Sequence, residues 1–248
     1  FHYLKIIEKS TLETPKMTDF FSSEVSLIGY LNFSTIPKLI SFFDDESNFY
    51  VVFEKPEGKS LLNFVSQNGK IDENKAKIFS ISFIETMQYL YMNLDSSIQW
   101  SISAETIFIK DDGNISQIYI FNKNSNLITL TNEISMKTTA PEVITHNKVS
   151  PKCMSWFLGS ILFYILNGYF PFEGNNVKEI QHNILYSHPI FISQLSKECL
   201  DFIESLLIKN PQMRISIEKA SLKPYINHVD VNSFSPKSFV KSLSADGI

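Results

Sequence analysis

Few side chains of this sequence combine the residue types and the spacing that enzyme chemistry needs. The five histidines show no metal-ligand spacing, and the sequence has no zinc motif and no nucleophile triad. The two cysteines, Cys153 and Cys199, suggest no disulfide framework, and packing is the expected role of Cys153 beside an apolar run. One charged residue stands out, because Lys5 lies inside the strand-like apolar run 1–8, FHYLKIIE. On pattern alone, such a lysine faces solvent.

The bulk composition excludes several classes of protein. The chain has 248 residues, of which 44% are hydrophobic and 19% charged, so we expect a globular protein of one or two domains. A net charge of -4 predicts neither nucleic acid nor an anionic membrane as partner. No signal or transit peptide is found. Two cysteines without a disulfide framework favour a reducing, cytoplasmic (intracellular) location.

The element that organises the chain is an apolar run at 156–166, WFLGSILFYIL. A helix that is hydrophobic on every side is buried on every side, either in a large domain or in a membrane. Eleven residues are too few for a bilayer, which needs roughly 20. The sequence therefore predicts a buried central helix at Pro151–Asn167, which Gly168 ends and Pro171 follows.

This stretch resembles the large lobe of the eukaryotic protein kinases. Three groups of residues carry the resemblance, in the order and spacing of that family: the A-P-E triplet at 140–142, the W-x-L-G pattern at 156–159, and Gly168 followed by Pro171-Phe172. The family's helix begins D-x-W-S-L-G, and its aspartate is Met154 in this sequence. The family also pairs the glutamate of the triplet with a late buried arginine, and Glu142 and Arg214 match these two structural positions.

The resemblance covers about residues 1–225 and implies an α+β fold with two lobes. It predicts a small, antiparallel, β-rich N-lobe at 1–54, truncated at its front, a hinge at 55–58, a larger, mainly helical C-lobe at 59–226, and a polar C-terminal tail at 227–248. The nearest type resembles the calcium/calmodulin-dependent and energy-sensing serine/threonine kinases. The expected strands are 1–8, 36–43, 48–53, 107–109 and 118–121, and the expected helices are 19–31, 61–68, 73–93, 177–187, 196–209 and 217–220.

The resemblance changes the interpretation of Lys5. The string K-I-I-E-K-S resembles the family's third strand, whose lysine pairs with the nucleotide phosphates and with a helix glutamate, here Glu24. The alternative is that Glu24 is a surface residue. The family also places two strands and a G-x-G-x-x-G loop ahead of this lysine. Nothing precedes Phe1 and no such loop follows, so we expect either an excerpt or a protein that lacks the loop.

The positions that surround adenine in the family are unusually bulky. Phe53 would be the gatekeeper residue, and Glu54 would begin the hinge. Tyr3 stands where the family has an alanine above the base, and Phe108 where it has an aliphatic residue below it. Two aromatic rings would fill much of this slot, and we expect them to pack against each other. The remnant pocket predicts weak nucleotide binding or none.

Four positions of the reaction centre lack the groups that phosphoryl transfer uses. Ser101 replaces the aspartate that accepts the substrate proton, and a serine hydroxyl is no base near neutral pH. Ser103 replaces a lysine, whereas Thr106 and Asn122 replace the asparagine and aspartate that hold magnesium. Since this chemistry depends on positioning and on metal ions, we expect no intact catalytic residue, no metal site and no cofactor.

These residues favour a catalytically inactive kinase-like domain, a pseudokinase that acts as a scaffold or an allosteric binding module in signalling. Its expected partner is a protein, such as an active kinase or a signalling complex. The alternative is a divergent but active serine/threonine kinase that uses ATP and Mg²⁺, with Lys5, Glu105 and Asp111 or Asp112 in unusual roles. A different enzyme on the same lobes would need a cluster of ionisable groups, and the sequence suggests none.

Overall fold

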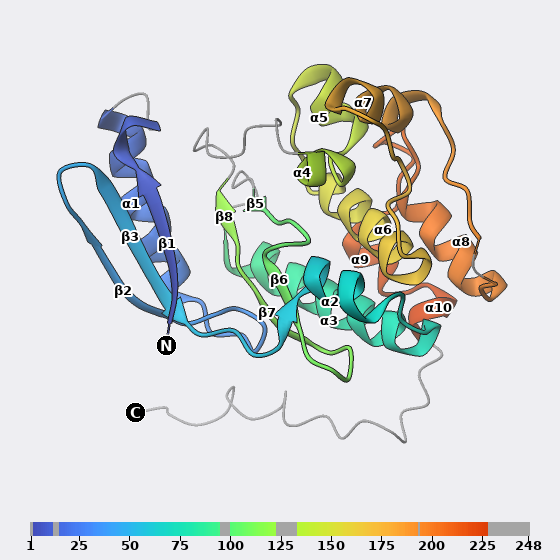
Figure 1. Ribbon diagram of the computed structural model, residues 1–248, viewed down its shortest axis with the longest axis horizontal. Helices are drawn as coiled ribbons and strands as arrows, with labels where there is room; N and C mark the ends of the chain where they lie inside the picture. Colours follow the sequence, from blue (N-terminus) through green and yellow to red (C-terminus); the bar gives the residue numbers. More distant parts are fainter. Residues whose placement is uncertain (1, 12–14, 95–99, 123–132, 193, 228–248) are drawn as a thin grey trace, which may run out of the picture.

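The computed structural model describes residues 2–11, 15–94, 100–122, 133–192 and 194–227 (Figure 1). At 11, 15–20, 23–24, 100–101 and 121–122 it describes the course of the backbone and not the side chains. A small β-rich lobe with one helix stands beside a larger helical lobe. The predicted α+β kinase-like fold is confirmed.

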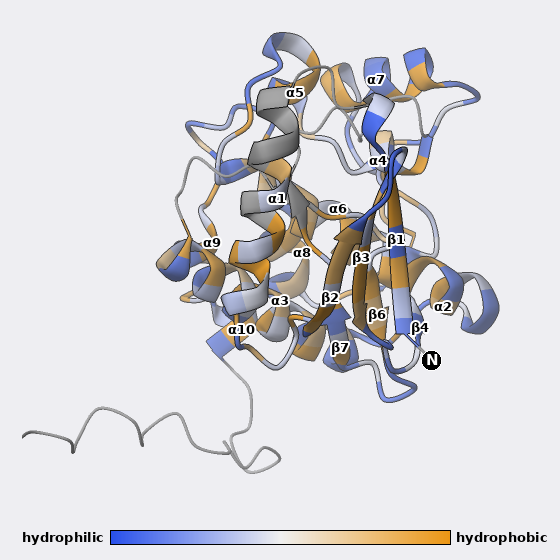
Figure 2. Cartoon of the chain, turned by 90° about the vertical axis from the view of Figure 1, so that its left-hand side faces the viewer, coloured by the Kyte–Doolittle hydropathy of each residue, from blue (hydrophilic) through white to orange (hydrophobic). Residues whose placement is uncertain are grey.

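The small lobe is a three-stranded antiparallel sheet with one long helix packed on it. Strand β3 lies between β1 and β2, and α1 runs beside the sheet (Figure 2). The elements of this lobe are β1 (His2–Glu8), η1 (Lys9–Thr11), α1 (Pro15–Tyr30), β2 (Leu39–Asp44) and β3 (Asn48–Glu54). Because side chains alternate along a strand, one face of the sheet turns toward α1. On that face Ile7, Val51 and Phe53 are buried together with Val25 and Ile28 of the helix.

The large lobe is built around the predicted central helix, α6 (Lys152–Asn167). Its side chains from Cys153 to Asn167 are all buried, and it contacts α3, α8 and α9. Gly168 ends the helix at a φ of 86°, in the left-handed region where a glycine is least strained. The other helices are α2 (Leu61–Asn68), α3 (Glu73–Asn93), α4 (Glu133–Lys137), α5 (Pro141–His146), α7 (Val177–Tyr186), α8 (Lys197–Leu206), α9 (Ile217–Ala220) and α10 (Pro224–Asn227).

Short strands pack beside α2 and α3 of the large lobe, and β4 and β6 contribute to a groove that Tyr3 of β1 also lines. They form a three-stranded sheet of order β4-β6-β7 and a two-stranded ladder of β5 and β8. Their bounds are β4 (Lys59–Ser60), β5 (Trp100–Ser101), β6 (Ile107–Ile109), β7 (Ile115–Ile118) and β8 (Phe121–Asn122). These strands carry several of the predicted site residues, such as Ser101 on β5 and Phe108 on β6.

Several element boundaries differ from the sequence-based expectation, among them the start of α1, which lies at Pro15 and not at residue 19. The strand expected at 118–121 is interrupted at Tyr119 and Ile120, between β7 and β8. The strand expected at 36–43 begins at Leu39, because the Ile36 amide closes a turn onto the Phe33 carbonyl oxygen at 2.9 Å. Helix α8 ends at Leu206 and not at residue 209.

The segment that follows α1 fastens the small lobe to α3 of the large lobe. The ring of Phe33 stacks on that of Tyr89 at 4.7 Å, and the Tyr89 hydroxyl accepts a hydrogen bond of 2.9 Å from the Asn32 amide. The hydroxyls of Thr35 and Thr86 are 2.5 Å apart and buried. The Ile118 amide then donates to the Thr35 carbonyl oxygen at 2.7 Å. Helix α1, α3 and β7 are therefore held together at one place.

Two further points concern the limits of the fold. None of the helices in the described ranges is long and apolar enough to cross a membrane. The residue limits expected for the lobes and the hinge stay predictions. Apart from residue 227, the last of α10, the expected polar tail lies outside the described residues.

Candidate nucleotide cleft

Lys5 lies on the inner face of the small sheet, toward α1. It pairs with Val51 across the β1–β3 ladder, and its side chain is partly buried. Burial lowers the pKa of its ammonium group to about 8, because removal from water disfavours the charged form. Glu24 lies on α1, but its side chain is outside the described part of the structure, so the Lys5–Glu24 ion pair stays a prediction.

The slot beside Lys5 is filled by aromatic rings from three elements. Tyr3 comes from β1, Phe108 from β6, and Tyr119 from the interruption between β7 and β8. The rings of Tyr3 and Tyr119 lie 4.2 Å apart, whereas Phe108 meets each of them edge-on, at 6.1 and 5.5 Å. Phe53 meets Tyr119 edge-on at 5.4 Å from the gatekeeper position. These separations are those of packed aromatic pairs, so an adenine ring would have to displace one of the rings.

The hydroxyl of Tyr119 also forms a hydrogen bond with a backbone group of the hinge. It donates a hydrogen bond of 2.8 Å to the backbone carbonyl oxygen of Glu54, and it lies 3.3 Å from the Gln117 side-chain oxygen. The side-chain amide of Gln117 donates a hydrogen bond of 2.7 Å to the Glu54 carboxylate. Burial raises the pKa of Tyr119, so its hydroxyl keeps the proton that it donates. Backbone carbonyls are among the groups that orient a bound ligand in a pocket. The Glu54 carbonyl oxygen already accepts a hydrogen bond from Tyr119.

Sequence reasoning did not single out Tyr119. Only a weak signal was present: a tyrosine between two isoleucines in the segment 115–120, ISQIYI, three residues before Asn122. In the continuous strand that we expected, the side chain of Tyr119 would not be predicted to point toward the hinge. The interruption of the strand, fixed by a 2.9 Å hydrogen bond from the Tyr119 amide to the Thr106 carbonyl oxygen, could not be read from the spacing.

The substituted catalytic positions come together in the β5–β8 ladder. Trp100 pairs with Asn122, and Ser101 pairs with Phe121. The backbone thus brings the position of the missing base next to the position of the missing metal ligand. The side chains of Ser101 and Asn122 are not among the described ones, so their roles stay predictions.

Ser103 and Thr106 use their hydroxyls to stabilise the turn between β5 and β6. The Thr106 hydroxyl accepts from the Ser103 amide at 3.0 Å and contacts the Ser103 carbonyl oxygen at 3.2 Å. The Ser103 hydroxyl accepts from the Glu105 amide at 3.3 Å. Local bonds of this kind are typical of serine and threonine in turns. Neither residue supplies a positive charge or a carboxylate for phosphoryl transfer.

The described acidic residues of the cleft region lie in separate places. Among the described residues, no three His, Cys, Asp or Glu side chains lie close enough together to hold an ion. Asp111 and Asp112 lie in the turn between β6 and β7, where Asp112 accepts from the Asn114 amide at 2.9 Å. Burial raises the pKa of Tyr3, and the negative charge of the exposed Glu105 raises it further.

A shallow groove remains outside the filled slot. It has a volume of about 510 Å³ and is lined by Tyr3 and Phe108, by the end of the hinge at Gly58, and by Lys59 and Glu105. The Lys59 ammonium donates to the Gln67 side-chain oxygen at 2.8 Å. Gly58 has a φ of 79°, and a Cβ atom there would lie 2.0 Å from the Ile109 carbonyl oxygen. The hinge therefore passes so close to β6 that only a glycine fits.

Comparison with known proteins identifies the family. The family model described as "Protein kinase domain" matches residues 2–226. The chain belongs to the protein kinase family. The assignment of the filled slot to the family's nucleotide site, and of the β5–β8 ladder to its reaction centre, follows from the sequence resemblance and stays a prediction.

Named kinases from several organisms are similar to this chain at low identity. A probable serine/threonine-protein kinase KIN1 homolog of Encephalitozoon cuniculi is 23% identical and covers 87% of this chain. An Aurora kinase of Dictyostelium discoideum is 24% identical over 94% of it, and the serine/threonine-protein kinase ATG1a of Arabidopsis thaliana is 24% identical over 91%. The chain spans 39%, 61% and 37% of the lengths of these three relatives. The expected kinase subtype stays a prediction.

This kinase-family lobe contains the ion pair that the resemblance implies. The Arg214 guanidinium donates two hydrogen bonds to the Glu142 carboxylate, at 2.8 and 2.9 Å, and both side chains are buried. Arg214 also donates to the carbonyl oxygens of Ile208, Lys152 and Lys209. Although burial opposes it, the guanidinium holds the pKa of Glu142 below its usual range. The pair joins α5, α6 and the loop after α8.

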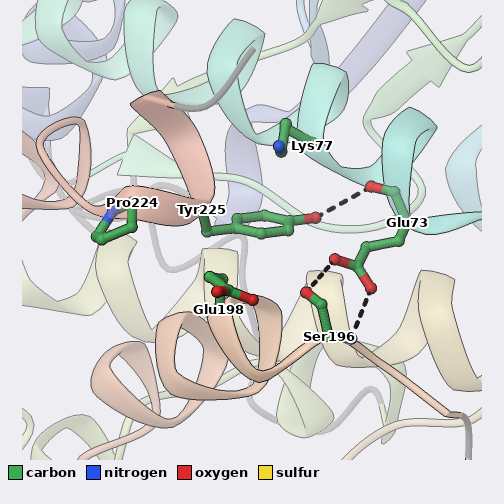
Figure 3. Close-up of a pocket in the computed structure, with 6 residues that line it drawn as sticks. All are labelled: Glu73, Lys77, Ser196, Glu198, Pro224 and Tyr225. Carbon is green, nitrogen blue, oxygen red and sulfur yellow. Dashed lines mark hydrogen bonds between the residues drawn. The ribbon is translucent and has the colours of Figure 1, made fainter. Parts of the chain in front are cut away.

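A second cavity, of about 240 Å³, lies on the large lobe of this kinase-family chain between α3, α8 and α10 (Figure 3). The Glu73 carboxylate accepts hydrogen bonds from the Ser196 amide, at 2.9 Å, and from the Ser196 hydroxyl. The Tyr225 hydroxyl donates to the Glu73 carbonyl oxygen at 3.1 Å, and the Lys77 ammonium lies 5.4 Å from the Tyr225 ring. These contacts join three helices, which assigns the cluster a structural role.

Proposed function

We propose that this chain is a catalytically inactive member of the protein kinase family, a pseudokinase that acts as a scaffold or an allosteric binding module. The observation that carries the proposal is the Tyr119 hydroxyl on the Glu54 carbonyl oxygen. The Tyr119 ring packs with Tyr3 and Phe108 in the slot, and its hydroxyl donates the hydrogen bond to the hinge carbonyl oxygen. We propose no cofactor, because the base and its hydrogen-bond partner would both have to be replaced.

The substitutions at the reaction centre support the same proposal. Phosphoryl transfer depends on metal ions and a positioned base, and Ser101, Ser103, Thr106 and Asn122 supply neither a carboxylate nor a positive charge. The Ser103 and Thr106 hydroxyls are engaged in their own turn. We propose an intracellular protein partner, such as an active kinase or a signalling complex, and neither nucleic acid nor membrane, since the net charge is -4.

The second candidate is a divergent, active serine/threonine kinase that uses ATP and Mg²⁺. Two observations favour it: Lys5 is retained on the inner face of β1, and the similar proteins are named as serine/threonine kinases. The turn position of Asp111 and Asp112, away from the β5–β8 ladder, weighs against their use as metal ligands.

A thermal-shift titration with ATP, with and without Mg²⁺, distinguishes the two candidates. A ligand at a hundred times its dissociation constant adds about 2.7 kcal/mol to stability, which a melting curve resolves. We expect no shift in either condition, with an active kinase domain as the positive control. A Mg²⁺-dependent shift that disappears in the Lys5→Met variant would contradict the proposal. Phosphate transfer at about 1–100 s⁻¹ would establish the active alternative.

A further inference from the structure

The walls of the filled slot belong to strand ladders, whereas the residue that fills it does not. Tyr3 pairs with Phe53 across the β1–β3 ladder, and Phe108 pairs with Gln117 across the β6–β7 ladder. Tyr119 instead lies in the interruption between β7 and β8, where it is completely buried. The walls are therefore fixed by backbone hydrogen bonds that do not involve the residue between them.

Two oxygen atoms converge on the hydroxyl of Tyr119. The backbone carbonyl oxygen of Glu54 lies 2.8 Å from it, and the side-chain oxygen of Gln117 lies 3.3 Å from it. Both oxygens are acceptors, whereas a tyrosine hydroxyl has a single proton to donate. The shorter bond is the one to Glu54, so this hydroxyl satisfies one of the two acceptors.

The orientation of the Gln117 side chain is fixed by its other end. Its amide nitrogen donates to the Glu54 carboxylate at 2.7 Å, and an ionised carboxylate can only accept. The reverse orientation of the amide would bring two acceptors together, so the Gln117 oxygen is the atom that points toward Tyr119. Gln117 is also buried, which limits the access of water to this oxygen.

We propose that Tyr119 acts as a built-in ligand that keeps the slot closed, and that the slot without it is a site for a planar aromatic molecule with a primary amino group. The ring of such a molecule takes the place of the Tyr119 ring beside Tyr3 and Phe108. Its two N–H groups reach both Glu54 and Gln117, whereas a hydroxyl supplies only one of these bonds. The proposal deepens the pseudokinase proposal and rests on the same closed slot.

The test removes the built-in ligand and supplies small replacements. Tyr119→Ala leaves a buried cavity, and engineered apolar cavities of this kind bind aromatic molecules of matching size. The probes are toluene, p-cresol and p-toluidine, which share a ring and a methyl group and carry no donor, a hydroxyl and an amino group, respectively. Binding is measured by isothermal titration calorimetry at neutral pH, where the amino group of an aromatic amine is uncharged.

We expect the affinity of Tyr119→Ala to rise in the order toluene, p-cresol, p-toluidine. One hydrogen bond separates the first two by about fivefold, and the second N–H adds a further factor of about two to five. Gln117→Leu in the same background should remove the preference for p-toluidine over p-cresol and keep that for p-cresol over toluene. The parent chain and the control Tyr186→Ala, at an exposed position, should bind none of the probes, because Tyr119 closes the slot in both.

Three results would overturn the proposal. The first is equal affinity of Tyr119→Ala for the three probes. The second is an unchanged preference for p-toluidine after Gln117→Leu. The third is binding of p-toluidine to the parent as tightly as to Tyr119→Ala, because Tyr119 would then not close the slot.

A second measurement covers the case in which Tyr119→Ala does not stay folded alone. The same order is then read from the yield of refolded protein with each probe, and a failure to refold with all three counts against the proposal. The pseudokinase proposal is tested on the parent chain with ATP, whereas these probes carry no phosphate and are tested on the variant. The two proposals can therefore fail separately.

Discussion

The bond between Tyr119 and the hinge makes a quantitative prediction for the variant Tyr119→Phe. This change removes one hydroxyl and keeps the ring, so the aromatic packing of the slot is preserved. A net hydrogen bond contributes about 1 kcal/mol, and a carbonyl left without its donor in a dry site raises the cost to about 2 kcal/mol. For a domain of this size each kcal/mol lowers the melting temperature by about 2–4 °C. We expect Tyr119→Phe to melt roughly 2–8 °C below the parent.

The measurement is differential scanning calorimetry of the parent, Tyr119→Phe and a control, Tyr186→Phe. Tyr186 lies at the end of α7 and is 70% exposed, so loss of its hydroxyl should change stability by less than about 0.5 kcal/mol. Equal melting temperatures for all three proteins would refute the reasoning, because they would mean that the Tyr119 hydroxyl contributes nothing at the hinge. The inference that the hinge carbonyl is occupied would then fail as well.

Three further changes test other parts of the structure. Arg214→Leu leaves the Glu142 carboxylate buried without its partner and should cost about 3–5 kcal/mol in urea unfolding, whereas Lys110→Met, at an exposed pair, should cost less than about 1 kcal/mol. Gly58→Ala should prevent stable folding because its Cβ would overlap a backbone oxygen, whereas Gly168→Ala, with a similar φ in the left-handed region and open space, should cost only about 1–2 kcal/mol of backbone strain. The pKa of Lys5 falls from 10.5 to about 8 on folding, so the unfolded chain binds more protons between these values and stability should rise as the pH increases from 8 to 10.5. Lys5→Met should flatten this rise in urea midpoints, and an unchanged slope would contradict the assigned burial.

The framework of the fold could be predicted from the sequence because its signals are local and strong. The run at 156–166 is apolar on every side, and a helix with that pattern has to be buried. Gly168 and the capping residue Asp72 mark helix ends through backbone geometry and a side-chain bond to the Lys75 amide. The match of Glu142 with Arg214 depended on the resemblance and not on the pattern.

The candidate site could be predicted only in part, because it depends on side-chain directions that periodicity does not contain. Tyr3 and Phe108 could be placed in the slot from their positions beside Lys5 and in the strand after the substituted loop. Tyr119 could not, since its direction follows from an interruption of the strand that is fixed by the Thr106 carbonyl oxygen. The half-exposed apolar residues Leu4, Ile6, Ile40 and Phe43 of the small sheet were also missed, because a strand with apolar residues on both faces has no alternation of apolar and polar positions.

The joint between α1, α3 and β7 has a consequence for the thermodynamics of association. An active kinase opens and closes its lobes in each cycle, so its hinge has to move. In this chain the Thr35–Thr86 contact and the Ile118 amide on Thr35 join the lobes at one place, and the Tyr119 hydroxyl on Glu54 joins them at a second. A partner that touches both lobes then loses little conformational entropy in ordering them, and more of the contact free energy appears as affinity. Under the proposed pseudokinase function, such pre-organisation would favour binding of the partner in one fixed geometry.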